Sequence, residues 1–69
     1  MAGFYVPEMQ FSLKELRARK NETQQQVAEA VGVSPQTYNA WEQDVSGVSI
    51  SKIYKLAEHF DVSVIDIKM

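Results

Sequence analysis

The sequence predicts a small all-α domain of five short helices, preceded by an extended N-terminal arm. Short segments begin at residues that cap helices well, and apolar residues recur within them at helical spacing. Turns containing Gly, Asn or Asp separate these segments. The chain has 69 residues and no cysteine, so it forms one small domain without disulfides. We therefore divide it into an arm over residues 1–11 and a helical domain over residues 12–69.

The arm is rich in apolar side chains, but Gly3 and Pro7 argue against a helix there. Its side chains can fold back over the small core of the domain. Alternatively, the arm can form an edge strand that pairs with a second subunit or reaches towards a partner. The sequence leaves both possibilities open.

The first helix begins at about Leu13, because Ser12 and Glu15 have the spacing of a capping box. Leu13 and Leu16 then face the core. Asn21 is expected to end this helix in the left-handed conformation, which Asn tolerates better than most residues.

Two further helices follow back to back. Thr23 and Gln26 form a second capping box, and Gly32 ends that helix in a left-handed conformation. Ser34 caps the next helix, whose first position is Pro35, where a missing N–H does no harm. The residues that face inward in the two helices are Val27, Ala28, Val31, Tyr38 and Trp41.

The outward side of the second of these helices carries small, uncharged residues. They are Gln36, Thr37, Asn39, Ala40 and Gln43. Gln and Asn side chains can form paired hydrogen bonds with adenine, and Thr or Ala can contact the methyl group of thymine. Two helices joined by a tight glycine turn are typical of a helix-turn-helix, whose second helix lies in the DNA major groove.

Together with the helices on either side of it, this stretch resembles the lambda-repressor-like (Cro/C1, or XRE) helix-turn-helix family of phage and bacterial regulators. The residues that carry the resemblance are Thr23-Gln24, Val27-Ala28, Val31-Gly32-Val33-Ser34, Thr37 and Trp41-Glu42. Flanking matches are Leu13, Leu16, Arg17, Leu56-Ala57 and Val62-Ser63. The resemblance covers roughly Ser12 to Ile67 and places the helix-turn-helix proper at residues 23–42.

The resemblance implies a sequence-specific DNA-binding regulator of transcription, of the repressor or Cro type. Relatives generally bind double-stranded DNA as homodimers on inverted repeats. The implied base contacts are Pro35, Gln36, Thr37 and Ala40. The implied phosphate contacts are Gln24, Ser34, Asn39, Gln43, Lys14, Arg19 and Lys20. Gln24 can also brace the recognition helix, and Arg17 is expected to form a structural ion pair with Glu42.

Ser49 opens a fourth helix, which Asp61 ends. Its expected buried face consists of Ile50, Ile53, Leu56, Ala57 and Phe60. His59 is expected to be solvated at the end of this helix.

Ser63 and Asp66 predict a capping box for a fifth helix that runs into Ile67. Core positions there are Val62, Val64 and Ile67. Ile65, together with Tyr54 or the arm, is expected to form an apolar patch for dimerisation through the fifth helix or the arm.

Charge argues against tight DNA binding. Seven Lys and Arg against nine Asp and Glu give a net charge of −2, whereas phosphate binding favours a basic face. Glu22 is expected to stabilise the start of the second helix but to weaken it as a phosphate site. Relatives often have Gly followed by Lys or Arg in the loop after the third helix, and this chain has Asp44 and Val45 at those places. Asp44 is expected to end the third helix in the left-handed region. The alternative function is therefore a protein-interaction module of the antitoxin or antirepressor type, with weak or no DNA binding.

Other classes of function lack support in the sequence. With no cysteine, one histidine and no Gly-rich phosphate loop, we expect no enzyme activity, metal or cofactor. No apolar run approaches the roughly 18 residues of a membrane span. The expected setting is the cytoplasm.

Overall fold

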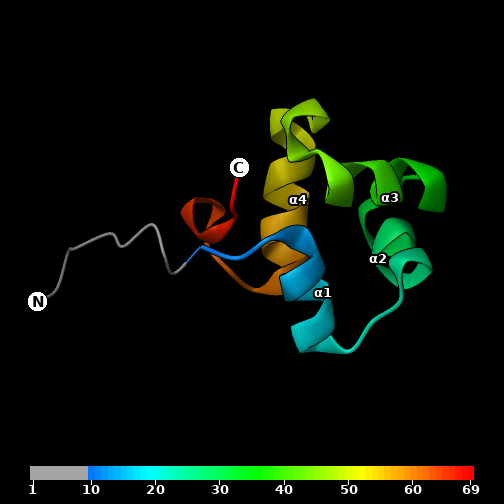
Figure 1. Ribbon diagram of the computed structural model, residues 1–69, viewed down its shortest axis with the longest axis horizontal. Coiled ribbons are helices and arrows are strands. Elements are labelled where there is room, and N and C mark those ends of the chain that lie inside the picture. Colours follow the sequence, from blue (N-terminus) through cyan, green and yellow to red (C-terminus); the bar gives the residue numbers. More distant parts are fainter. Residues whose placement is uncertain (1–9) are drawn as a thin grey trace, which may run out of the picture.

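Four α-helices and two short 3-10 turns form the part of the chain that the computed structural model describes, residues 10–69. The α-helices are α1 (Leu13–Lys20), α2 (Gln24–Val31), α3 (Pro35–Gln43) and α4 (Ile50–Phe60). The turns are η2 (Val45–Gly47) and η3 (Val64–Asp66). Figure 1 shows α4 in the middle, with α2 and α3 on one side of it and η3 on the other. Most of the predicted arm, residues 1–9, lies outside the described residues.

Local capping fixes where the helices begin. Each α-helix follows a Ser or Thr whose side-chain oxygen accepts a hydrogen bond from the backbone N–H three residues further on. These capping residues are Ser12, Thr23, Ser34 and Ser49. The predicted capping boxes with Glu15 and Gln26 both form.

The C-terminal ends of three helices adopt the left-handed conformation that satisfies their last carbonyls. Asn21 and Asp61 have φ of 57°, and Gly32 has φ of 79°. The prediction of a left-handed conformation for Asp44 is wrong. Its φ is −151°, and its carboxylate accepts hydrogen bonds from the backbone N–H and the hydroxyl of Ser46. Asp44 therefore ends α3 and caps η2 from an extended backbone.

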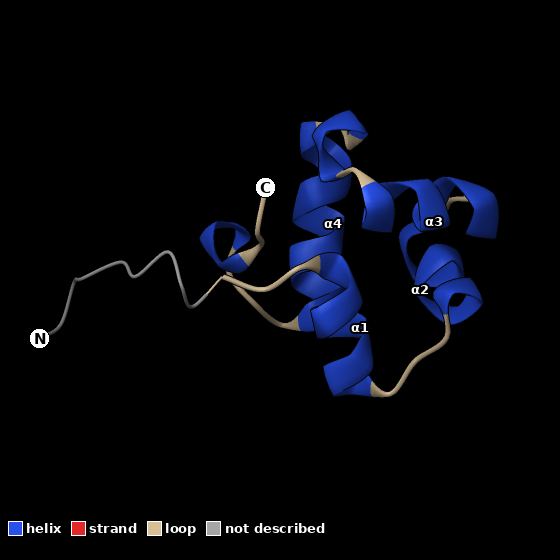
Figure 2. Ribbon diagram, in the orientation of Figure 1, coloured by secondary structure: helices blue, strands red, loops and turns tan. Residues whose placement is uncertain are grey.

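The core lies where the α-helices meet the C-terminal segment (Figure 2). Its buried members are Leu13, Leu16, Val27, Ala28, Val31, Tyr38, Ile53, Leu56, Ala57, Phe60 and Ile67. Val62 and Val64 are partly buried against it, as the apolar pattern predicts. The prediction of a buried Ile50 is wrong, because this residue is 73% exposed. It is the first residue of α4, and Figure 1 places that turn beside the loop after α3, at the edge of the helical packing.

The predicted fifth helix is wrong in its extent, because the structure forms only the single 3-10 turn η3 there. Ile67 leaves the turn with an extended backbone, is fully buried and forms an isolated parallel bridge with Phe11. The Phe11 N–H donates to the carbonyl of Asp66 (2.8 Å), and the Lys68 N–H donates to the carbonyl of Phe11 (2.8 Å). These bonds use backbone groups that a longer helix would need.

None of the helices within residues 10–69 has the length and apolar character required to cross a bilayer.

Candidate nucleic-acid interface

The turn between α2 and α3 sets the direction of α3. Gly32 adopts its positive φ there, and the Val33 N–H donates to the carbonyl of Ala28 (2.9 Å). The ring of Tyr38 is fully buried and meets the ring of Trp41 edge to face, with centroids 6.3 Å apart. Burial of Tyr38 anchors one side of α3 in the core, so the opposite side faces solvent.

All four residues predicted to contact bases are exposed on α3: Pro35, Gln36, Thr37 and Ala40. Thr37 is oriented by its neighbour, because its backbone N–H and its hydroxyl oxygen both interact with the Ser34 hydroxyl (3.1 and 3.0 Å). The Thr37 hydroxyl accepts in the second of these bonds, so its own proton can be donated outward.

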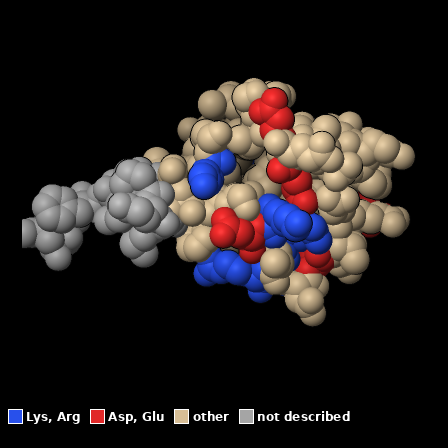
Figure 3. Space-filling model, viewed as in Figure 1, with Lys and Arg blue, Asp and Glu red and all other residues tan. Residues whose placement is uncertain are grey.

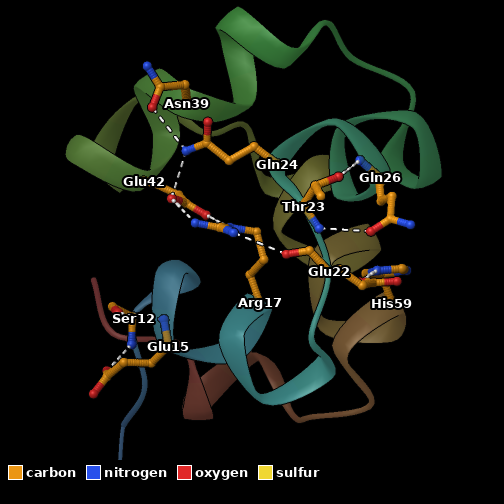
Figure 4. Close-up of polar contacts among 10 residues, drawn as sticks. All are labelled: Ser12, Glu15, Arg17, Glu22, Thr23, Gln24, Gln26, Asn39, Glu42 and His59. Atoms are coloured by element: carbon orange, nitrogen blue, oxygen red, sulfur yellow. Dashed lines mark hydrogen bonds and ion pairs between the residues drawn. The ribbon is translucent and has the colours of Figure 1, made fainter.

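A network of polar side chains connects α3 to α1 and α2 (Figure 4). The predicted ion pair is confirmed, with Arg17 Nε 2.6 Å and Nη2 3.3 Å from the two carboxylate oxygens of Glu42. Arg17 Nη1 also donates to the carbonyl of Glu22 (3.0 Å). Burial by itself raises the pKa of Glu42, but hydrogen bonds from Arg17 and Gln24 outweigh it, so the pKa lies below its ordinary value. Glu42 is thus held as a carboxylate at the end of α3.

Gln24 completes this network from the first turn of α2. Its Nε2 donates to Asn39 Oδ1 (3.0 Å) and to Glu42 Oε1 (2.9 Å). A Gln amide has two N–H donors, so both are used within the domain. The bracing arrangement expected for Gln24 is therefore present. Because Asn39 accepts through Oδ1, its Nδ2 group points away from Gln24 (Figure 4).

The remaining predicted phosphate contacts fall into two groups. Ser34, Asn39 and Gln43 are exposed on or next to α3. The cations Lys14, Arg19 and Lys20 belong to α1, whereas α3 itself contains no Lys or Arg. In Figure 3 the surface over α2 and α3 is largely free of blue atoms.

Two of these three cations also make contacts elsewhere in the domain. The guanidinium carbon of Arg19 lies 4.6 Å from the ring centroid of Phe11, and Lys20 Nζ donates to the carbonyl of His59 (3.3 Å). Neither contact involves α2 or α3. The predicted phosphate-binding cations therefore all belong to α1, and α3 itself contributes no basic side chain.

The structure also contains an interaction that local sequence reasoning missed. The sequence predicts that Glu22 acts on the start of α2 and that His59 is solvated, but Glu22 Oε1 and His59 Nε2 lie 2.7 Å apart. The His59 side chain is only 18% exposed. Because these residues are 37 positions apart, no local pattern marks the pair.

A second missed interaction supports the turn before α3. Lys52 Nζ, on α4, donates to the carbonyl of Val31 at the end of α2 (3.1 Å). This bond satisfies one of the last carbonyls of α2, next to the glycine turn. The residues are separated by 21 positions, so the pairing again depends on tertiary packing.

A family model described as helix-turn-helix matches residues 13–67, which is most of the chain. The protein belongs to this Cro/C1-type (XRE) helix-turn-helix family. Membership implies DNA binding and transcriptional regulation by a domain that is not an enzyme. Comparisons with curated proteins and with solved structures found no match. The match covers α1 through η3, so the capped helices described above all lie within the helix-turn-helix domain.

Proposed function

We propose that this protein is a sequence-specific transcriptional regulator of the repressor or Cro type, acting in the cytoplasm. One observation supports it most directly: burial of Tyr38 leaves Pro35, Gln36 and Thr37 together on the exposed start of α3. The start of the recognition helix is the part that enters the major groove in helix-turn-helix proteins.

Sequence discrimination rests on few side chains in this proposal. Gln36 forms the paired hydrogen bonds with adenine, while Thr37 donates its hydroxyl proton to a base edge. Pro35 and Ala40 contact thymine methyl groups. Each good paired contact is worth about 1–3 kcal/mol of discrimination, so Gln36 carries the largest share.

Contacts with phosphates set the position of the helix-turn-helix on the duplex. Ser34, Gln43 and the Nδ2 group of Asn39 serve as neutral donors, helped by the α1 cations Lys14, Arg19 and Lys20. Gln24 acts mainly through Asn39 and Glu42, because a contact with a phosphate would cost it one of its two internal hydrogen bonds. Affinity is thus expected to depend on salt less steeply than in strongly basic repressors.

The proposed assembly is a homodimer on an inverted repeat, with half-sites about one DNA turn apart. Exposed apolar residues in the C-terminal segment support a self-association surface there. Ile65 is 60% exposed and Met69 is 68% exposed.

The test is to select bound sequences from random DNA and to titrate the best one by fluorescence anisotropy at low and moderate salt. Gln36→Ala is expected to weaken binding about 10-fold or more and to relax preference at one base pair, as loss of a paired contact should. Gln25→Ala removes an exposed glutamine of α2 to which we assign no contact, and it should bind like the unmodified protein.

The alternative function is a protein-interaction module of the antitoxin or antirepressor type on the same fold. The net charge of −2 and the lack of cations in α3 favour it. Absence of DNA binding even at low salt, with no effect of Gln36→Ala, would support this alternative.

A further inference from the structure

The side chain of Lys52 joins the first turn of α4 to the last turn of α2. Lys52 is the third residue of α4, and its backbone N–H donates to the Ser49 hydroxyl that caps this helix (3.4 Å). From there the side chain, which is partly buried, reaches the carbonyl of Val31 (3.1 Å). Lys52 is thus held by a helix cap at its backbone and by a hydrogen bond at its ammonium group.

The bond from Lys52 holds one side of the peptide plane that precedes the glycine turn. The carbonyl of Val31 and the N–H of Gly32 belong to the same planar peptide group. The Gly32 N–H donates back to the carbonyl of Glu29 (3.3 Å), so both polar groups of this plane are bound. Gly32 then turns the chain with its φ of 79°, and α3 begins shortly afterwards at Pro35. The orientation of this plane therefore sets the direction in which the chain enters α3.

The sequence after α2 cannot supply the bond that Lys52 makes. A continued α-helix would satisfy the carbonyl of Val31 with the N–H of the residue four positions later, but that residue is Pro35, which has none. Among the described residues, the donor to this carbonyl is Lys52, on another helix. A cation at the C-terminal end of a helix also interacts favourably with the helix dipole.

We propose that Lys52 is a positioning residue for α3, which holds the turn so that the start of the recognition helix keeps the geometry needed to read bases. Pro35, Gln36 and Thr37 follow the turn directly. Paired hydrogen bonds to a base edge require the side chain to be held in a narrow range of directions. Lys52 itself contacts no base. Its role in base reading rests on the proposed DNA-binding function, whereas its restraint on the turn does not.

Amide hydrogen exchange of the protein without DNA tests the restraint on the turn. In Lys52→Met the N–H groups of Gly32 and Val33 are expected to exchange about 3- to 10-fold faster relative to those of α1, as loss of one hydrogen bond should allow. Lys55→Met removes the same charge from the exposed face of α4 and should leave this ratio unchanged. An unchanged ratio in Lys52→Met would overturn the proposal, because Lys52 would then contribute only to global stability or to nothing.

Titration of the best selected DNA and of a scrambled sequence tests the effect on base reading. Lys52→Met is expected to lower the ratio of the two affinities about 3- to 10-fold, which is part of the discrimination that a paired base contact provides. Lys52→Arg keeps the charge and the hydrogen-bond donors, so it should restore the ratio. Lys55→Met should leave the ratio as it is. The titrations are carried out at a temperature at which circular dichroism shows every variant to be folded.

The salt dependence of these titrations separates positioning from direct contact with DNA. If Lys52 holds the turn, the slope of log affinity against log salt should be the same in Lys52→Met and Lys55→Met. A slope shallower by about 0.9 in Lys52→Met, with the sequence preference intact, would make Lys52 a phosphate ligand instead and would refute the positioning role.

Failure of the unmodified protein to bind any DNA would overturn the proposed function and, with it, the role of Lys52 in base reading. The exchange measurement would still decide whether Lys52 holds the turn. Faster exchange at the turn together with an unchanged sequence preference would leave the DNA-binding function in place and refute only the positioning role.

Discussion

The carboxylate of Glu42 lies 2.6 Å from Nε of Arg17, which ties the end of α3 to the middle of α1. Only 5% of the Glu42 side chain and 20% of the Arg17 side chain are exposed, so removal of either partner leaves a charge that water solvates poorly. We expect Arg17→Met to lower the free energy of unfolding by about 3 kcal/mol, as for other buried pairs broken on one side.

A double-mutant cycle checks this expectation by urea denaturation. The variant Arg17→Met/Glu42→Leu should cost less than the sum of the two single changes, since neither charge is then left alone. Lys55→Met, on the exposed face of α4, serves as the control and should change stability little. Additive effects of the two changes would mean that the pair contributes nothing as a unit.

The free energy of unfolding should fall at acid pH because the carboxylate of Glu42 becomes protonated. The pKa of Glu42 is lowered in the folded protein, because its hydrogen bonds outweigh the effect of burial. The unfolded chain, with an ordinary Glu pKa of about 4.3, therefore binds the proton at higher pH than the folded chain. The stabilisation that the Glu42 carboxylate contributes is complete above the pKa of the unfolded chain. It is lost as pH falls through the lower pKa of the folded chain.

Urea denaturation at pH 7 and pH 3.5 measures this contribution. The unmodified protein should lose more stability between the two conditions than Glu42→Gln, which has no proton to bind at that site. Equal losses in the two proteins would exclude Glu42 as a source of the pH dependence.

Gly32 is required by backbone conformation rather than by space. Its φ is +79°, and an added Cβ would meet only Lys52 Nζ, at 3.7 Å. Gly32→Ala is expected to lower the free energy of unfolding by about 1–2 kcal/mol, the cost of a left-handed conformation for a residue with a Cβ. Gly47→Ala is the matched control, because a Cβ added there would meet no described atom within 4 Å and the φ of Gly47 is not positive. Thermal unfolding followed by circular dichroism should show a larger loss of stability for Gly32→Ala than for Gly47→Ala. Equal losses would mean that the positive φ of Gly32 does not set the cost.

Gln24 should act as a brace between helices. Gln24→Ala removes two internal hydrogen bonds, whereas Gln24→Glu places a second carboxylate beside Glu42. We expect Gln24→Ala to cost about 1 kcal/mol of stability and Gln24→Glu to cost more, because like charges repel at this distance. Urea denaturation at pH 7 measures the free energy of unfolding of both variants and shows which of them loses more stability. If Gln24→Glu proved the more stable of the two, the contact between Gln24 and Glu42 would not exist in solution.

The absence of Lys and Arg from α3 predicts how a charge change there alters DNA binding. Gln43→Lys adds a cation at the exposed end of α3, where we propose a phosphate contact. The logarithmic dependence of affinity on salt should then steepen by about 0.9, the value for one additional neutralised phosphate. Ser51→Lys, exposed on α4, makes the same change in net charge and is the control. Equal slopes for the two variants would remove Gln43 from the proposed interface.

The sequence by itself determined the local features of this domain. Capping by Ser12, Thr23 and Ser34, and the left-handed ends at Asn21 and Gly32, follow from signals within a few residues of each helix end. The inward positions of α2 and α3 follow from the helical period in the same way. The family resemblance also implies the Arg17–Glu42 pair, which periodicity alone does not mark.

Only the tertiary structure decided features that depend on which helix ends meet. The Glu22–His59 contact joins residues 37 positions apart, and the bond from Lys52 to Val31 spans 21. The C-terminal segment stops at one 3-10 turn because Ile67 is buried and bridges Phe11, which lies near the other end of the chain. Capping and periodicity act over one or two turns of helix, whereas these pairings exist only once the helices have packed.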